Sequence, residues 1–256
     1  MVDHRKIASE LYNAELENVP IEQITKVYEN LSIDDAYKIQ IINIEKKISE
    51  GKKITGKKIG LTSKAMQESL GVDTPDFGFL YDSMEVLNGV IPKGAILQPR
   101  VEGELALILK RDLGDEGTIE EVWEATEYVV PAIEIVGSRI KDWKLTIVDT
   151  IADNASCGMY LLSDVKIDPR VTDLRDIQMK LYKNEELINS GYGSAVLDNP
   201  ANAVLWLAKS LRKYGVNLNK GDIVLAGALS AAIPAVSGDC FVCDFGEFGR
   251  LEVDFE

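Results

Sequence analysis

The most informative stretch of the sequence is Gln98-Pro-Arg-Val-Glu102-Gly-Glu104-Leu-Ala-Leu-Ile-Leu109. Its apolar second half predicts a buried β-strand over 101–109. Side chains two residues apart in a strand share one face, so Glu102 and Glu104 point the same way. Two carboxylates at the start of an apolar strand repel each other and lose their hydration, and a bound cation would remove that cost.

Glu134 interrupts a second apolar strand, Tyr128-Val-Val-Pro-Ala-Ile-Glu134-Ile-Val136. A carboxylate among such neighbours is expected to be buried and therefore needs a partner. Together with Glu102 and Glu104 it fits Mg²⁺ or Mn²⁺, since these hard cations favour oxygen ligands in near-octahedral geometry. Coordination positions would remain for a bidentate 2-oxo carboxylate and water. The alternative is a charge cluster at a strand edge, with Glu134 paired to a lysine or arginine.

The composition limits the classes of function. The chain has 256 residues, 46% of them apolar, which predicts a packed core. Its 42 acidic residues against 28 basic ones give a net charge of −14, which disfavours nucleic acid as a partner. The polar start of the sequence lacks the apolar core of a secretory signal, and no stretch is apolar for long enough to span a membrane. We expect a cytoplasmic protein.

Cysteine and histidine are too few for several kinds of site. Cys157, Cys240 and Cys243 are the three cysteines, and the single histidine is His4. An odd, low cysteine count argues against a disulfide framework, and a lone Cys240-Phe-Val-Cys243 has no second ligand pair for zinc. We interpret the cysteines as buried structural thiols. One histidine also excludes serine–histidine or cysteine–histidine catalysis.

The chain is predicted to begin with helices and to continue mainly as strands. We divide it into an N-terminal, mainly helical region over 1–75 and a β-rich catalytic domain over 76–256. Helices are predicted within the first fifty residues, where Ser32 resembles a helix cap, and then from Ser63, over 118–126 and over 199–214. The predicted strands cover 53–62, 79–81, 84–87, 96–98, 101–109, 128–136, 159–162, 177–182, 186–190 and much of 222–256.

Three further polar groups are candidates for a site, each with a simpler explanation. Lys57 and Lys58 are adjacent in a predicted strand, so one of them should face inward, unless both are solvated. Asp76 lies in Val72-Asp-Thr-Pro-Asp-Phe-Gly78, which reads as a turn that could carry an acid–base carboxylate. The small, polar stretch over 149–158 could line a pocket or form a helix end.

Several motifs occur in an order that resembles a known family. They are Gly60-Leu-Thr-Ser63, Pro75-Asp-Phe-Gly78, Gln98-Pro-Arg-Val-Glu-Gly-Glu104, Gly137-Ser-Arg-Ile-Lys-Asp-Trp143 and Ala152-Asp-Asn-Ala-Ser-Cys-Gly158. Together they resemble the hydratase/decarboxylase branch of the fumarylacetoacetate hydrolase superfamily over nearly the whole chain. This resemblance implies an α+β fold, a mixed β-roll with a smaller N-terminal α/β region.

The resemblance also implies roles for individual residues and partners. Glu102, Glu104 and Glu134 match the metal ligands, for Mg²⁺ or Mn²⁺. Lys58 matches the active-site lysine, and Asp76 and Ser156 match pocket positions. Members of this branch usually form homo-oligomers, and a hydratase can associate with a related decarboxylase.

The activity implied is that of a hydro-lyase in the meta-cleavage breakdown of aromatic compounds. It would add water to 2-hydroxypenta-2,4-dienoate and give 4-hydroxy-2-oxopentanoate. Residues 228–234, Ala-Leu-Ser-Ala-Ala-Ile-Pro, carry no cation for a distal carboxylate, which disfavours diacid substrates. The alternatives are a 4-oxalocrotonate decarboxylase, an acylpyruvate hydrolase or isomerase, and a non-catalytic partner subunit.

Overall fold

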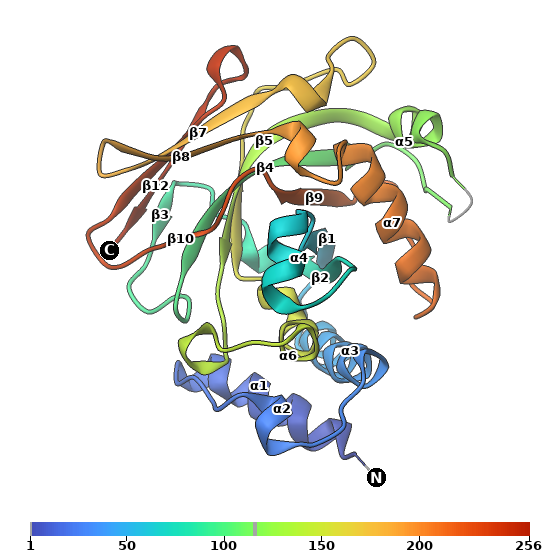
Figure 1. Cartoon of the computed structure of the whole chain (residues 1–256), viewed down its shortest axis with the longest axis vertical. Coiled ribbons are helices and arrows are strands. Elements are labelled where there is room, and N and C mark those ends of the chain that lie inside the picture. Colours follow the sequence, from blue (N-terminus) through green and yellow to red (C-terminus); the bar gives the residue numbers. More distant parts are fainter. Residues whose placement is uncertain (1, 115–116) are drawn as a thin grey trace.

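The larger of two β-sheets runs through the middle of the molecule (Figure 1). The structure is a computed structural model that describes residues 2–114 and 117–256. The strand order of this sheet is β2-β1-β9-β4-β5-β6, and β10 pairs with β4. Neighbouring strands are antiparallel except for β1 and β9, which are parallel. Its strands are β1 (Ile54–Gly60), β2 (Asp76–Tyr81), β4 (Arg100–Leu109), β5 (Thr126–Val136), β6 (Met159–Leu162), β9 (Ile223–Ala228) and β10 (Ile233–Pro234).

The smaller sheet packs against the larger one and contains much of the C-terminal part of the chain (Figure 1). Its order is β3-β12-β11-β7-β8, with β3 parallel to β12 and the other pairs antiparallel. Its strands are β3 (Val90–Ile91), β7 (Gln178–Lys183), β8 (Glu186–Tyr192), β11 (Cys240–Asp244) and β12 (Arg250–Phe255). Apolar residues alternate with exposed ones along β12, as expected for a strand with one solvated face.

The helices pack at the edges of this β structure (Figure 1). The helix α1 packs on α3, and α3 packs on α6, while α7 lies against β1 and β9. The helices are α1 (His4–Glu17), α2 (Ile24–Val27), α3 (Ile33–Ser49), α4 (Lys64–Leu70), α5 (Ile119–Ala125), α6 (Ile147–Ala152) and α7 (Pro200–Arg212). Ser32 and Asp35 form the expected capping box at the start of α3. No helix in the described ranges has the length and apolar character needed to cross a bilayer.

The pairing of β4 with β5 is the longest ladder of the fold and places the candidate ligands. Both strands are buried on both faces, because the larger sheet is covered by helices on one side and by the smaller sheet on the other. In the register of this pair Glu102 lies opposite Glu134, and Glu104 lies opposite Ala132. The fold class expected from the sequence, α+β with a mixed β-roll, is confirmed.

Two local predictions are wrong. Residues 84–87 form no strand, because Asp82–Met84 is a 3-10 turn and only Glu85 makes an isolated bridge. Residues 96–98 form no strand either, since Gln98 has φ = 49° and its amide binds the carbonyls of Ser138 and Ile140. The polar stretch over 149–158, expected to line a pocket or form a helix end, contains the end of α6, which begins at a capping box of Thr146 and Asp149.

The division of the chain near residue 75 stays a prediction. In the structure β1, which precedes that point, pairs with β2 and β9 inside the larger sheet. The N-terminal region therefore contributes a strand, as well as helices, to the body of the molecule.

Candidate active site

Three glutamates on β4 and β5 converge on one point. Glu102 and Glu134 are directly opposite each other across the two strands, and Glu104 is the next residue on the same face of β4. One carboxylate oxygen from each lies within 4.8 Å of the others. The exposed fractions of Glu102, Glu104 and Glu134 are only 7%, 1% and 1%. The strand alternation read from the sequence thus predicts the geometry that the structure has.

The carboxylates of this group are poorly compensated by protein partners. Burial, together with the charge of Glu134, raises the pKa of Glu102 to about 7. Burial also raises the pKa of Glu104 and of Glu134. Glu104 accepts one hydrogen bond, from the amide of Gly227 at 3.0 Å, whereas neither carboxylate oxygen of Glu134 has a hydrogen-bond partner within the described chain. Buried oxygens without donors suit a hard divalent cation, so these residues fit such an ion.

Lys58 extends from β1 toward the glutamates. Its Nζ lies 3.6 Å from Oε1 of Glu134, and its side chain is buried. Burial alone would lower the pKa of Lys58, but the carboxylates of Glu134, Asp76 and Glu102 outweigh burial and raise it. These carboxylates therefore favour the positively charged form of Lys58 beside the candidate ligands.

Lys57 is buried like Lys58, so the alternative that both lysines are solvated is wrong. It is also buried, but on the opposite face of β1, where its Nζ lies 2.5 Å from Oδ2 of Asp222. Asp222 in turn accepts a hydrogen bond from the amide of Asn219 at 2.7 Å. Adjacent strand residues point to opposite faces, so one lysine serves the candidate site and the other forms a separate buried ion pair.

Asp76 shares the face of Lys58, because it pairs in register with Gly60 of β1. It is the first residue of β2 and 1% exposed, so it does not belong to a solvated turn. A side chain at position 60 would displace Asp76, since a Cβ atom on Gly60 would lie 2.2 Å from Oδ1 of Asp76. Burial raises the pKa of Asp76 despite the opposing charge of Lys58.

The hydroxyl group of Thr150 connects Asp76 to Ser156. The Thr150 hydroxyl donates to Oδ2 of Asp76 at 3.3 Å and lies 3.4 Å from the Ser156 hydroxyl. The other oxygen of Asp76, Oδ1, has no hydrogen-bond partner within the described residues. Asp76, Thr150 and Ser156 therefore form a short polar chain that could move a proton. Thr150 was missed from the sequence, although it lies on the buried face of a helix with a recognisable cap.

Ser156 is presented by an unusual turn. Asn154, Ala155 and Ser156 have φ values of 54°, 50° and 55°, a left-handed conformation that costs free energy in residues other than glycine. The Asn154 amide holds the turn to β2, accepting from the amide of Phe79 at 2.9 Å and donating to its carbonyl at 3.0 Å. The amide of Gly137 donates to the carbonyl of Ser156 at 2.9 Å. These bonds fix the hydroxyl of Ser156 next to Thr150.

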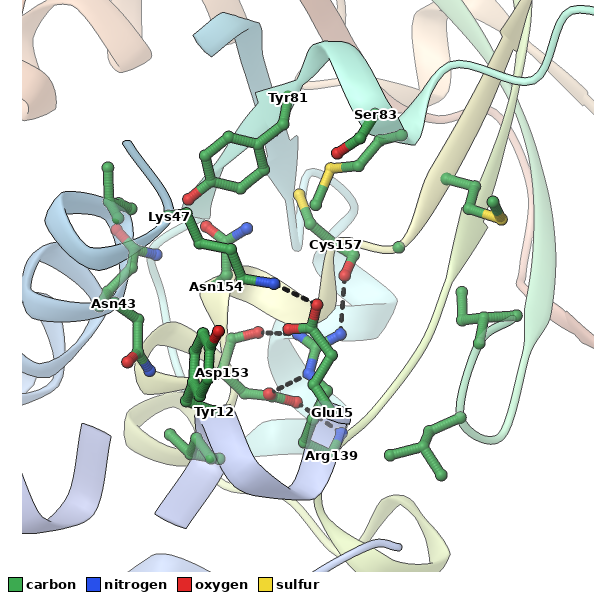
Figure 2. A pocket seen from close by; sticks show the side chains of 18 of the residues that line it. Tyr12, Glu15, Asn43, Lys47, Tyr81, Ser83, Arg139, Asp153, Asn154 and Cys157 are labelled. Atoms are coloured by element: carbon green, nitrogen blue, oxygen red, sulfur yellow. Dashed lines mark hydrogen bonds and ion pairs between the residues drawn. The ribbon is translucent and has the colours of Figure 1, made fainter. Parts of the chain in front are cut away.

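The back of the turn is held by a buried ion pair (Figure 2). Arg139 binds the carboxylate of Asp153, which is 3% exposed, and also donates to the carbonyls of Asp153 and Cys157. A cavity of about 170 Å³ lies on the far side of this ion pair from Ser156. Residues of α1 and α3, such as Tyr12 and Lys47, also line this cavity. The turn thus separates this cavity from the glutamates.

A cavity of about 450 Å³ opens above the glutamates. Lys58, Asp76, Glu102 and Ser156 are among its polar lining residues. Residues 228–232 form one wall, and they carry no charged side chain. Much of the remaining wall is apolar, as is usual for a small-molecule site. Its apolar residues include Leu61, Met66, Val136, Leu145 and Leu229.

Arg100 is a lining residue that was not singled out from the sequence. It is two residues before Glu102 in β4, so the same alternation that pairs Glu102 with Glu104 places Arg100 on their face. Its guanidinium lies over the ring of Trp143, 4.3 Å from the ring centroid. The strand spacing could therefore have identified it.

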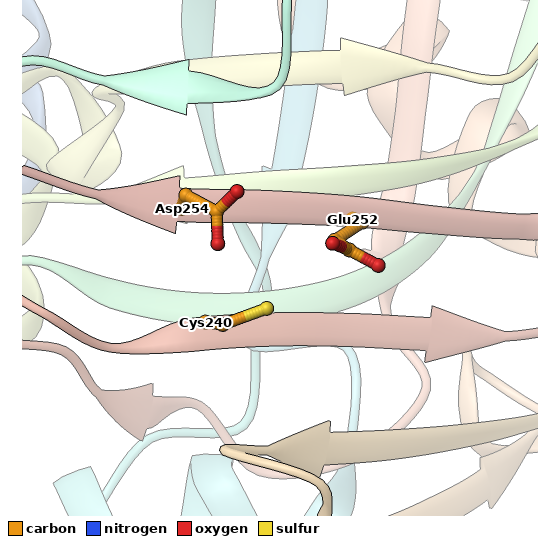
Figure 3. A group of neighbouring side chains, drawn as sticks. All are labelled: Cys240, Glu252 and Asp254. Atoms are coloured by element: carbon orange, nitrogen blue, oxygen red, sulfur yellow. The ribbon is translucent and has the colours of Figure 1, made fainter.

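A second acidic group lies at the surface of the smaller sheet. Cys240 of β11 and Glu252 and Asp254 of β12 have ligand atoms within 4.8 Å of one another (Figure 3). The two acidic residues are exposed, and Cys240 is half-buried, whereas Cys243 is buried as expected. The three-residue spacing puts Cys240 and Cys243 on opposite faces of β11, so they do not form a paired thiol site.

Comparisons with known proteins show the family of the chain. Residues 75–256 match the family model described as fumarylacetoacetate (FAA) hydrolase C-terminal. A 2-keto-4-pentenoate hydratase of Paraburkholderia xenovorans (strain LB400) is 44% identical over 97% of this chain and 93% of its own length. A 2-hydroxyhexa-2,4-dienoate hydratase of Comamonas testosteroni is 41% identical over 96% of this chain and 94% of its own length.

A solved structure is also similar over the whole chain. The 4-oxalocrotonate decarboxylase from Pseudomonas putida G7, complexed with magnesium and adipate, has a TM-score of 0.94 and 30% identity, covering 100% of this chain and 99% of its own. The hydratases are therefore closer in sequence than this decarboxylase, and the expectation of a hydro-lyase is confirmed. By the family match and by this similarity, the chain belongs to the fumarylacetoacetate hydrolase family.

Proposed function

We propose that this protein is a divalent-metal-dependent hydratase that converts 2-hydroxypenta-2,4-dienoate into 4-hydroxy-2-oxopentanoate. The observation that carries the proposal is the group of three buried carboxylates with Lys58 beside them, of which Glu102 and Lys58 line a largely apolar cavity. The 44% identity to a 2-keto-4-pentenoate hydratase supports the same substrate class. A homo-oligomer, and association with a related decarboxylase, remain part of this proposal.

Glu102, Glu104 and Glu134 would hold Mg²⁺ or Mn²⁺, because three carboxylates suit a hard cation. When bound, such an ion supplies Lewis acidity and a template at the 2-oxygen and C1 carboxylate of the substrate. Three protein ligands leave room for both of these groups. The magnesium in the related decarboxylase supports Mg²⁺ as the first ion to test.

The residues of the chain itself would stabilise charge and move protons. Lys58 faces the developing negative charge of the 2-oxygen with a fixed ammonium group. We assign proton transfer to Asp76, whose raised pKa and hydroxyl neighbours Thr150 and Ser156 suit a group that gains and loses a proton. In this mechanism C5 of the dienol is protonated first, which gives 2-oxopent-3-enoate, and water then adds at C4.

The wall formed by residues 228–232 supports a substrate without a distal carboxylate. A second carboxylate entering beside Ala228, Ala231 and Ala232 would find no cation on that wall. This favours the hydratase over the second candidate, a 4-oxalocrotonate decarboxylase, whose substrate is a diacid. The structural similarity to a decarboxylase, with a TM-score of 0.94, is the observation that keeps this second candidate in the test.

The decisive assay follows 2-hydroxypenta-2,4-dienoate and 4-oxalocrotonate by their ultraviolet absorbance, each with Mg²⁺, with Mn²⁺ and with a chelator. We expect metal-dependent loss of the dienoate and formation of 4-hydroxy-2-oxopentanoate. Release of carbon dioxide from 4-oxalocrotonate without hydration of the dienoate would replace the hydratase with the decarboxylase. Turnover that survives complete chelation would overturn the metal-dependent mechanism.

A further inference from the structure

Arg100 is a cation that lines the cavity without an acidic partner. Within the described ranges no carboxylate lies within 4.0 Å of its guanidinium, whereas Lys58, Arg139 and Lys57 each have one. The group is half-buried and touches the face of an aromatic ring. Glu102 attracts the guanidinium electrostatically but forms no ion pair with it, so the donors of Arg100 are available to a ligand.

The position of Arg100 is fixed by its neighbours. Trp143, which stacks on it, donates its indole N–H to the carbonyl of Gln98 at 2.9 Å. Asp142 and Trp143 have φ values of 60° and 54°, so this segment adopts a costly backbone conformation that places the indole beneath the guanidinium. The Gln98 amide group in turn accepts from the amide of Asp142 at 2.7 Å. These contacts hold Trp143 in place, and Trp143 holds the guanidinium of Arg100.

The charge of the surroundings explains why a ligand would need this cation. The chain carries a net charge of −14, and Glu102 and Asp76 line the cavity, with Glu104 and Glu134 close behind Glu102. An anionic substrate approaching through such surroundings is repelled unless positive charge faces it at the cavity wall. Lys58 is already beside Glu134, which leaves Arg100 as the lining cation with free donors among the described residues.

We propose that Arg100, stacked on Trp143, binds the C1 carboxylate of the 2-oxo acid beside the metal site. This inference rests on the proposed function, because it takes a 2-oxo acid as the ligand. Arg100 and Glu102 are two residues apart on one face of β4, so the guanidinium is near the metal-binding end of the cavity. A planar guanidinium also matches a carboxylate with two parallel hydrogen bonds.

The test measures ligand binding by calorimetry, with Mg²⁺ present, in the wild type and in Arg100→Gln. The ligands are 2-oxopentanoate, which lacks the reactive diene, and its neutral amide, 2-oxopentanamide. We expect Arg100→Gln to weaken binding of the acid about 10- to 100-fold, the usual range for one charged hydrogen-bonded pair, and to change binding of the amide little. Equal losses for acid and amide, or no loss for the acid, would overturn the proposal.

Control variants separate this role from a structural one. Arg111→Gln removes an arginine that is half-exposed and paired with Glu124, and it should leave binding unchanged. Trp143→Leu should cause a smaller loss for the acid than Arg100→Gln, since it removes the stacked ring and keeps the cation. Thermal unfolding and Mg²⁺ titration of each variant show whether the fold and the metal site persist.

A third ligand, 2-oxohexanedioate, tests the other end of the cavity. A loss of affinity for this diacid, without a loss for 2-oxopentanoate, would overturn the proposal by assigning Arg100 to a distal carboxylate. Because binding is measured without turnover, a chain that binds 2-oxopentanoate through Arg100 but does not hydrate the dienoate would refute the proposed function alone. A chain that hydrates the dienoate with Arg100→Gln at wild-type KM would refute this inference alone.

Discussion

The two acidic groups of this protein have the same local design and different surroundings. Each lies on a pair of neighbouring antiparallel strands, Glu102, Glu104 and Glu134 on β4 and β5, and Glu252 and Asp254 with Cys240 on β11 and β12. The first group is buried, whereas the acidic residues of the second are exposed to solvent, where water satisfies them. Burial, rather than acidity, therefore distinguishes the candidate metal site, because only the buried carboxylates lose their hydration.

Removing one buried ligand should produce the largest effect. We expect Glu102→Gln to lower metal-dependent kcat/KM roughly a thousandfold, since the coordinating charge is lost. Asp254→Asn in the exposed group is the matched control and should leave both turnover and Mg²⁺ binding unchanged. Steady-state kinetics and Mg²⁺ titration check both variants. Normal activity of Glu102→Gln with metal still bound would end the metal-site assignment.

The two buried lysines offer the next comparison. Lys58→Met should lower kcat about a hundredfold, because the ammonium beside Glu134 is lost from the site. Lys57→Met should instead lower the free energy of unfolding by about 3–5 kcal/mol, since it leaves Asp222 buried without its partner, and activity per folded molecule should persist. Chemical unfolding and kinetics of both variants distinguish the two roles. Loss of activity in Lys57→Met, together with loss of stability alone in Lys58→Met, would mean that the two lysines have the reverse roles.

Adding metal should stabilise the protein more at higher pH. Without metal, burial raises the pKa of Glu102 from an ordinary value near 4.5 to about 7, so between these values the folded state binds more protons than the unfolded state. Stability from this group therefore falls as the pH rises toward 7, and Mg²⁺ replaces the lost protons. We expect a larger Mg²⁺-induced rise in melting temperature at pH 8 than at pH 6. An equal rise at both values would contradict this coupling.

The turn at Ser156 should give the smallest change in activity. Asn154→Ala removes two hydrogen bonds to Phe79 from a left-handed residue, which should cost about 2–3 kcal/mol of stability and reduce kcat about tenfold by displacing Ser156. Ala155→Gly keeps all side-chain hydrogen bonds and tolerates the same φ, so its stability should stay within about 1 kcal/mol of wild type. Unfolding curves and kinetics measure both. An unchanged kcat in Asn154→Ala would separate the turn from catalysis.

The sequence predicts the candidate ligands better than their surroundings. Glu102 and Glu104 share a face because of strand alternation, and Glu134 stands out because its neighbours are apolar. The side of β1 that Lys58 occupies depends on pairing with the distant β9, which no local pattern reveals. Only the family resemblance indicated Lys58 as the active-site lysine. No sequence pattern predicted that Lys57 is buried as well.

Two features that were not predicted, the inward position of Thr150 and that of Arg100, could have been found from local sequence patterns. Thr146 and Asp149 have the spacing of a capping box, so α6 and the inward position of Thr150 could have been predicted. Arg100 shares the face of Glu102 by the same alternation that was applied only to the glutamates. By contrast, the left-handed turn at Asn154 depends on contacts with β2 and Arg139 and has no signature in its own residues.

The parallel pairing of β1 with β9 has a consequence for how the protein is made. The hairpin of β4 and β5 brings Glu102 and Glu134 together from nearby positions, but β1 is joined to β4 through β9, which ends at residue 228. On the ribosome the glutamates can therefore meet well before Lys58 is anchored beside them. Long-range pairing of this kind is slow, so we expect a nascent chain to pass through a stage in which the glutamates are close together and Lys58 is not yet beside them.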